Sequence, residues 1–211
     1  MKKINLSSSV SALVLAAGLF AATFQAAGQS VLIKVYTWDP SNVRFVAQAA
    51  NASANASVDI AYGVDLIKFF TSTPAPGITG GFVNGNLIPA GTNFAYNAWE
   101  TDNLLSLGKY VDLNLYTTGT SATQVFSTAT RAFNNNTATI NLSSFLAYLP
   151  AVGATGNIYS GDVNATGQNW LIGTWVVVVP EPSVEAQLAL GAMVLAGLAF
   201  IRRTRRVSAS R

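Results

Sequence analysis

The most constraining feature of this 211-residue sequence is a set of short stretches in which apolar and polar residues alternate. Residues 58–67 place apolar side chains at every second position, and residues 111–116 and 140–143 repeat the pattern. A period of two is typical of a β-strand with one buried face. Further β-branched, apolar runs occupy residues 31–36, 43–47 and 170–179. No long helical periodicity accompanies these runs, so the pattern predicts an all-β domain.

Turn-forming residues separate the predicted strands. Proline and glycine at 74–77 and three asparagines at 134–136 mark two turns. Asn84-Gly85, which lies between two apolar pairs, predicts a two-residue β-hairpin. Short strands with such frequent turns predict an antiparallel β-sandwich, jelly-roll-like, over residues 29–179.

The composition excludes several classes of chemistry. The chain has no Cys and no His, which removes disulfides, thiolate nucleophiles, the commonest general base and the commonest transition-metal ligands. Motifs for phosphate loops, dinucleotide folds and hydrolase elbows are not found, in particular no Gly-x-Ser-x-Gly. We therefore expect no cofactor, no metal and no enzymatic activity.

The excess positive charge of the chain lies at its two ends. The formal net charge is +3, but residues 29–182 contain five basic and eight acidic side chains, a net charge of −3. A protein that follows nucleic-acid phosphates needs a basic surface. The charge distribution therefore argues against a nucleic-acid partner.

Residues 1–28 have the order of a secretory signal peptide. Lys2 and Lys3 precede a 13-residue apolar run, 10–22, and small residues follow at 26–28. The run is shorter than the ~20 residues that span a bilayer. We expect cleavage after Gly28 rather than the alternative, a retained N-terminal anchor.

A second apolar segment, residues 186–201, has only Gln187 as a polar residue and is 16 residues long. It predicts a single transmembrane helix over residues 184–201. Four arginines follow it directly: Arg202, Arg203, Arg205 and Arg206. By the positive-inside rule this basic cluster is cytoplasmic and the preceding domain lies outside, the orientation that Lys2 and Lys3 also require.

Pro180, Glu181 and Pro182 stand immediately before this predicted helix. The two prolines favour an extended backbone, which presents the Glu181 carboxylate on a short rigid stalk. The alternative, that the prolines merely end a strand and cap a helix, does not account for the arginine cluster.

Pro-Glu-Pro, an apolar helix and an arginine cluster in this order resemble the PEP-CTERM sorting domain, here residues 180–211. The resemblance implies processing by exosortase, an integral-membrane enzyme of exopolysaccharide-producing Gram-negative bacteria. It also implies export through the inner membrane, transient anchoring by the C-terminal helix, and a final place at the cell surface or outside the cell.

These observations lead to the expectation of a structural or interaction protein of an extracellular polysaccharide, or biofilm, matrix. The alternative is a carbohydrate-binding module that uses Trp170, Trp175 and Trp99 to contact glycan. Trp170 and Trp175 are five residues apart, so on a regular strand they would face opposite sides and could not both be core residues. Core packing combined with one edge aromatic is the simpler interpretation of these tryptophans.

Two groups of oxygen-bearing side chains are further candidate sites. Residues 162–167 resemble the opening of a calcium loop, but the twelfth position is Gly173 where a glutamate is needed. Glu100 and Asp102 could form a carboxylate pair for glycan hydrolysis. A turn is the favoured interpretation of the first group, and solvated loop charge of the second.

Overall fold

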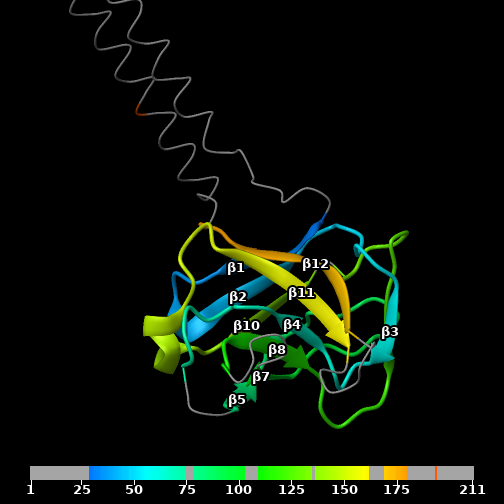
Figure 1. Ribbon diagram of the computed structural model, residues 1–211, viewed down its shortest axis with the longest axis horizontal. Coiled ribbons are helices and arrows are strands. Elements are labelled where there is room, and N and C mark those ends of the chain that lie inside the picture. Colours follow the sequence, from blue (N-terminus) through cyan, green and yellow to red (C-terminus); the bar gives the residue numbers. More distant parts are fainter. Residues whose placement is uncertain are drawn as a thin grey trace, which may run out of the picture. The chain divides into compact units, whose positions relative to one another are not determined.

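The computed structural model describes residues 29–74, 78–102, 109–134, 136–161 and 169–179, together with Met193 (Figure 1). The chain divides into two compact units, residues 1–177 and 178–211. The predicted signal peptide, 1–28, and the predicted sorting domain, 180–211, lie outside the described residues except for Met193. Among the residues that are described, no helix has both the length and the hydropathy needed to cross a membrane.

The described residues of the first unit form twelve strands and two short 3-10 helices. In chain order they are β1 (Val31–Tyr36), η2 (Pro40–Asn42), β2 (Val43–Ala47), β3 (Ala56–Asp59), β4 (Val64–Leu66), β5 (Gly80–Phe82), β6 (Asn84–Gly85), β7 (Ala98–Asp102), β8 (Asp112–Tyr116), β9 (Thr123–Phe126), β10 (Thr137–Ile140), η3 (Ser143–Tyr148), β11 (Thr155–Gly161) and β12 (Asn169–Val177). The all-β prediction is confirmed.

Ten of these strands form one mixed sheet in the order β5-β7-β8-β4-β11-β12-β1-β2-β10-β6, and β3 pairs with β9 in a separate ribbon. Among the described strands, only the β1–β12 pair is parallel. The two edge strands, β5 and β6, are separated in the chain by Val83 alone, so residues 80–85 pass from one edge of the sheet to the other. The sheet is therefore nearly closed into a barrel, which differs from the predicted pair of facing antiparallel sheets (Figure 1).

The predicted hairpin at Asn84-Gly85 is wrong, because these two residues form a strand. They pair with Thr139 and Ala138 of β10, whereas β5 pairs with β7. Gly85 has φ 110°, and a Cβ there would collide with the backbone oxygen of Thr137. The glycine therefore permits the close approach of β6 to β10 that nearly closes the sheet.

Gly85→Ala is expected to lower the free energy of unfolding by about 2–3 kcal/mol, because it adds a steric clash to an unfavourable φ. Gly119→Ala is the matched control, since Gly119 has φ 78° but open space around the added Cβ, and should cost only about 1 kcal/mol. Urea denaturation of both variants measures the difference. Equal losses would contradict the close approach of β6 to β10.

Aromatic side chains fill one part of the core. Phe69 contacts the rings of Phe45, Phe70 and Trp175 at centroid distances of 5.7, 5.1 and 5.5 Å. Such tilted and edge-on contacts add to the stabilisation that burial itself provides. These side chains belong to one continuous apolar core.

A buried glutamine links the separate β3–β9 ribbon to the ten-stranded sheet. Gln124 of β9 is fully buried and donates hydrogen bonds to the Gly63 backbone oxygen, at 2.6 Å, and to Ser160 Oγ, at 3.1 Å. Its Oε1 accepts a bond of 2.7 Å from the hydroxyl of Tyr96. The polar atoms of Gln124 are thus satisfied, and the ribbon is fixed to the sheet.

Candidate functional site

The tryptophans that the sequence suggested for glycan contact lie mainly in the core. Trp175 and Trp99 are only 1% and 4% exposed, and Trp170 is partly buried against the core. Trp38, which was not among the three, is 70% exposed. A sugar needs an accessible ring face, so the positions of Trp99 and Trp175 favour core packing.

The inference that Trp170 and Trp175 face opposite sides is wrong because β12 contains a bulge. Ile158 of β11 pairs with Gly173, and the next residue, Tyr159, pairs with Leu171. Ile172 of β12 therefore has no partner in β11. Trp175 then lies opposite Gly156 and Trp170 opposite Ser160, two positions on the same face of β11. A bulge reverses the alternation beyond it, which a regular period of two does not anticipate.

Four acidic side chains gather on three adjacent strands. Asp65 lies on β4, Asp112 on β8, and Glu100 and Asp102 on β7. Asn114 of β8 pairs with both Asp65 and Glu100, and Asp112 pairs directly with Asp102. Because side chains alternate between the faces of a strand, these residues share one face of the sheet. We call Asp65, Glu100, Asp102 and Asp112 the acidic cluster.

The acidic cluster is largely buried, so the prediction of solvated loop charge at Glu100 and Asp102 is wrong. Asp65 and Asp112 are fully buried, Asp102 is buried, and Glu100 is half-buried. Asp112 Oδ1 accepts a 2.6 Å hydrogen bond from the backbone N–H of Lys68, a residue with φ 55°. The cause of the error is that Glu100 and Asp102 belong to a strand paired on both sides.

Neither carboxylate oxygen of Asp65 accepts a hydrogen bond from a backbone N–H or from another donor group of the described residues. Asn114 Oδ1 likewise lacks a donor, while Asn114 Nδ2 donates to the Tyr62 backbone oxygen at 3.1 Å. Asp65 faces the carboxyl group of Asp102, and two carboxyl groups form a hydrogen bond only when one of them carries a proton. This arrangement favours a protonated Asp65.

The electrostatics of the cluster agree with that assignment. Burial, followed by the nearby charge of Asp102, raises the pKa of Asp65 well above its ordinary value. Partial burial and Asp102 also raise the pKa of Glu100, against the opposing effect of a hydrogen bond from Tyr116. Burial raises the pKa of Tyr96, with a further contribution from Asp65.

The geometry of the cluster limits its chemistry. A general acid must reach the proton acceptor on a substrate, but Asp65 is 0% exposed. Within the described ranges, no three acidic side chains are arranged to hold a metal ion. The cluster is therefore best explained as a proton-holding structural site.

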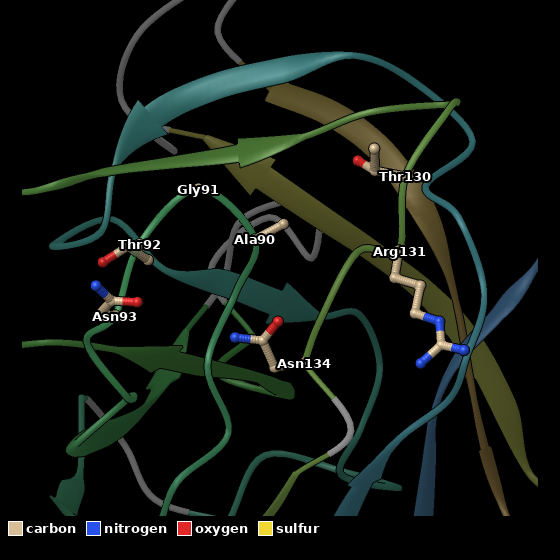
Figure 2. Close-up of a pocket in the computed structure, with 7 residues that line it drawn as sticks. All are labelled: Ala90, Gly91, Thr92, Asn93, Thr130, Arg131 and Asn134. Carbon is tan, nitrogen blue, oxygen red and sulfur yellow. The ribbon is translucent and has the colours of Figure 1, made fainter.

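A polar pocket of about 520 Å³ lies elsewhere on the domain, between two segments that are distant in the sequence (Figure 2). Its lining residues are Ala90, Gly91, Thr92, Asn93, Thr130, Arg131 and Asn134. Figure 2 shows the Asn134 amide between the two segments and the Arg131 guanidinium directed away from Thr92 and Asn93. The pocket lining contains no carboxylate.

Backbone hydrogen bonds hold the two walls of this pocket together. Ala90 donates to the Ala132 oxygen and Asn134 donates to the Ile88 oxygen, both at 3.0 Å. Gly91 has φ 79°, and a Cβ there would lie 2.8 Å from the side chain of Val125. These contacts fix the spacing of the two segments beside the pocket.

Comparison with protein-family models, curated proteins and solved structures finds no match. The function of the chain therefore has to be inferred from its sequence and its own geometry.

Three groups of residues that the sequence singled out lie outside the described residues. They are the sorting motif Pro180, Glu181 and Pro182, the basic cluster Arg202, Arg203, Arg205 and Arg206, and the calcium-loop candidate 162–167. The polar pocket, conversely, was not found from the sequence. Arg131 is one of five basic residues between 29 and 182, but nothing local connects it to Asn93.

Proposed function

We propose that this protein is exported, sorted by exosortase through its PEP-CTERM-like tail, and retained at the cell surface or in the extracellular polysaccharide matrix as a structural or interaction protein. The order of the sorting motif, apolar segment and arginine cluster in residues 180–211 is the basis of the proposal. The inner membrane and exosortase are the partners during sorting.

The observation that carries this proposal is where the β domain ends. β12 ends at Val177, which is also the last residue of the first compact unit. β12 pairs with β1 and β11 near the middle of the ten-stranded sheet. Removal of residues 180–211 would leave all of the described strands intact, whereas a cut upstream of Val177 would remove part of β12. This arrangement suits a tail that is processed after folding.

The chemistry of the described residues supports a role other than catalysis. The acidic cluster is largely buried, and the lining of the polar pocket contains neither a carboxylate nor a histidine that could act as a base. A matrix protein needs stability and adhesive contacts rather than a reactive group.

Replacing Pro180, Glu181 and Pro182 together by alanine should block processing in a producing cell that contains exosortase. The expected result is accumulation of a membrane-bound form with the mass of the unprocessed tail, detected by fractionation and immunoblotting. Val179→Ala is the matched control and should be processed normally. Normal release of the triple variant would contradict the assignment of the sorting motif.

A second candidate function is glycan binding, and the polar pocket is the observation that favours it. Small-ligand sites are usually clefts of about 300–1,000 Å³ with a few convergent polar groups in a mainly apolar lining. This pocket has a volume in that range and the polar groups, but its lining is mainly polar. Amide and hydroxyl groups both donate and accept hydrogen bonds, as sugar hydroxyls require.

A further inference from the structure

We infer that the polar pocket binds a carboxylate-bearing sugar, a uronate unit of an acidic polysaccharide, with Arg131 pairing the carboxylate and the side chains of Asn93 and Asn134 bonding the ring hydroxyls. This inference rests on the second candidate function, glycan binding, and specifies the class of glycan.

Arg131 supplies the positive charge of the pocket. Arg131 is exposed and makes no ion pair with any residue in the described part of the chain, and no acid lines the pocket. Arg44, by contrast, is already placed over the Tyr36 ring, at 4.5 Å from its centroid. A guanidinium group forms two parallel hydrogen bonds with a carboxylate. Arg131 is therefore available to an anionic ligand.

The neutral polar side chains of the pocket can form hydrogen bonds with a ligand. Thr92 Oγ1 accepts a 3.1 Å bond from the backbone N–H of Phe94. The side chains of Asn93, Thr130 and Asn134 make no hydrogen bond within the described ranges, so their polar atoms are free for a ligand. In Figure 2 the Asn134 amide lies between Asn93 and Arg131. The Arg131 guanidinium is directed away from Asn93 in that view, so pairing the carboxylate of a sugar held by the two amides requires the exposed Arg131 side chain to rotate toward Asn134.

Because the net charge of the domain is negative, a polyanion needs a specific positive site in order to bind. Residues 29–182 carry a net charge of −3, so the domain as a whole repels a polyanion. A polyanion would bind only where a local, preorganised group offsets that repulsion. The Arg131 guanidinium provides such a group, on a segment that two backbone hydrogen bonds join to residues 88–90.

The test is a calorimetric titration of the purified full chain, in detergent, with oligogalacturonate and with its methyl ester, which keeps the sugar rings but removes the charge. The acid form should bind at least about tenfold more tightly than the ester. Arg131→Gln should weaken binding of the acid form about tenfold and leave binding of the ester unchanged. Arg44→Gln is the matched control, with the same loss of charge, and should bind like the wild type.

Several results would overturn the inference. Equal binding of the acid and its ester, or equal weakening by Arg131→Gln and Arg44→Gln, would contradict the assigned role of Arg131 while leaving glycan binding in place. Binding of neither form would contradict glycan binding itself. The full chain also carries the C-terminal arginine cluster, so binding of dextran sulfate alone decides nothing; weakening of dextran sulfate binding by Arg131→Gln to the same extent as oligogalacturonate binding would show that Arg131 attracts any polyanion and would also overturn the inference.

A second variant separates binding from folding. Asn134→Ala keeps the charge of Arg131 and should weaken both ligands, because it removes a hydroxyl contact that they share. The thermal midpoints of Arg131→Gln and Asn134→Ala should match the wild type, since both side chains are exposed. Unchanged binding by Asn134→Ala would contradict the proposed placement of the sugar.

Discussion

Replacing Trp175 by alanine is expected to lower the free energy of unfolding by about 3–5 kcal/mol. The ring is 1% exposed, packs at 5.5 Å from the Phe69 centroid and donates from Nε1 to the Ile67 oxygen at 3.3 Å. Its position against Gly156 is so close that a Cβ there would lie 2.7 Å from Nε1. The truncation would leave a large cavity and an unsatisfied carbonyl. Urea denaturation measures the loss.

Trp38→Ala is the control for this substitution. Trp38 is 70% exposed, so the same truncation should change the free energy of unfolding by less than about 0.5 kcal/mol. A small effect at Trp175 together with a large effect at Trp38 would contradict the assignment of core and surface.

Asp65→Asn is expected to stabilise the protein by about 1–3 kcal/mol at pH 7, because asparagine is neutral and folding no longer requires the buried side chain to take up a proton. Below the ordinary pKa of an aspartate, about 3.9, Asp65 is protonated in the folded and the unfolded protein. As the pH rises, the unfolded carboxyl group ionises while the folded one, whose pKa is raised by burial and by Asp102, keeps its proton. The wild type therefore loses about 1.4 kcal/mol per pH unit until the folded pKa is reached.

Urea midpoints between pH 4 and 8 test this prediction. The stability of Asp65→Asn should decline less with pH than that of the wild type, with a remaining slope in the same direction from Glu100, whose pKa is also raised. Asp39→Asn is the matched control. Asp39 caps η2 with a 3.0 Å hydrogen bond from the Ser41 N–H, a role that asparagine performs equally well. Parallel pH profiles for wild type and Asp65→Asn would contradict a protonated Asp65.

The positions of several strands could be predicted from the sequence because their burial pattern is local. The apolar runs at 31–36 and 43–47 coincide with β1 and β2, and the run at 170–179 overlaps β12. The alternating stretch 58–67 was less simple, because it contains the end of β3, a turn at Gly63 with φ 62°, and β4. The alternation continues through that turn, so periodicity alone does not locate it.

The pairing of strands could not be predicted in the same way. Closure of the sheet depends on residues 80–85 reaching both β7 and β10, and the shared face of Trp170 and Trp175 depends on a bulge in β12. Both are properties of strands that meet across the fold. No signal in the local sequence specifies them.

The candidate sites could not be predicted either, because they depend on residues that are distant in the sequence. Asp65 has the sequence pattern of the polar position of a half-buried strand, and it becomes fully buried beside Asp102 in the folded chain. The polar pocket likewise joins residues 90–93 to residues 130–134. Sequence reasoning identified Glu100 and Asp102 as a pair, but their burial follows from long-range pairing with β8.

The intact mass of the mature protein, isolated from the outside of the producing cell, tests the central claim most directly. If exosortase sorts the protein, this mass corresponds to a chain without residues 1–28, without the apolar segment 186–201 and without the arginines that follow it. Exported material whose mass still includes both that apolar segment and the C-terminal arginines would contradict sorting by exosortase.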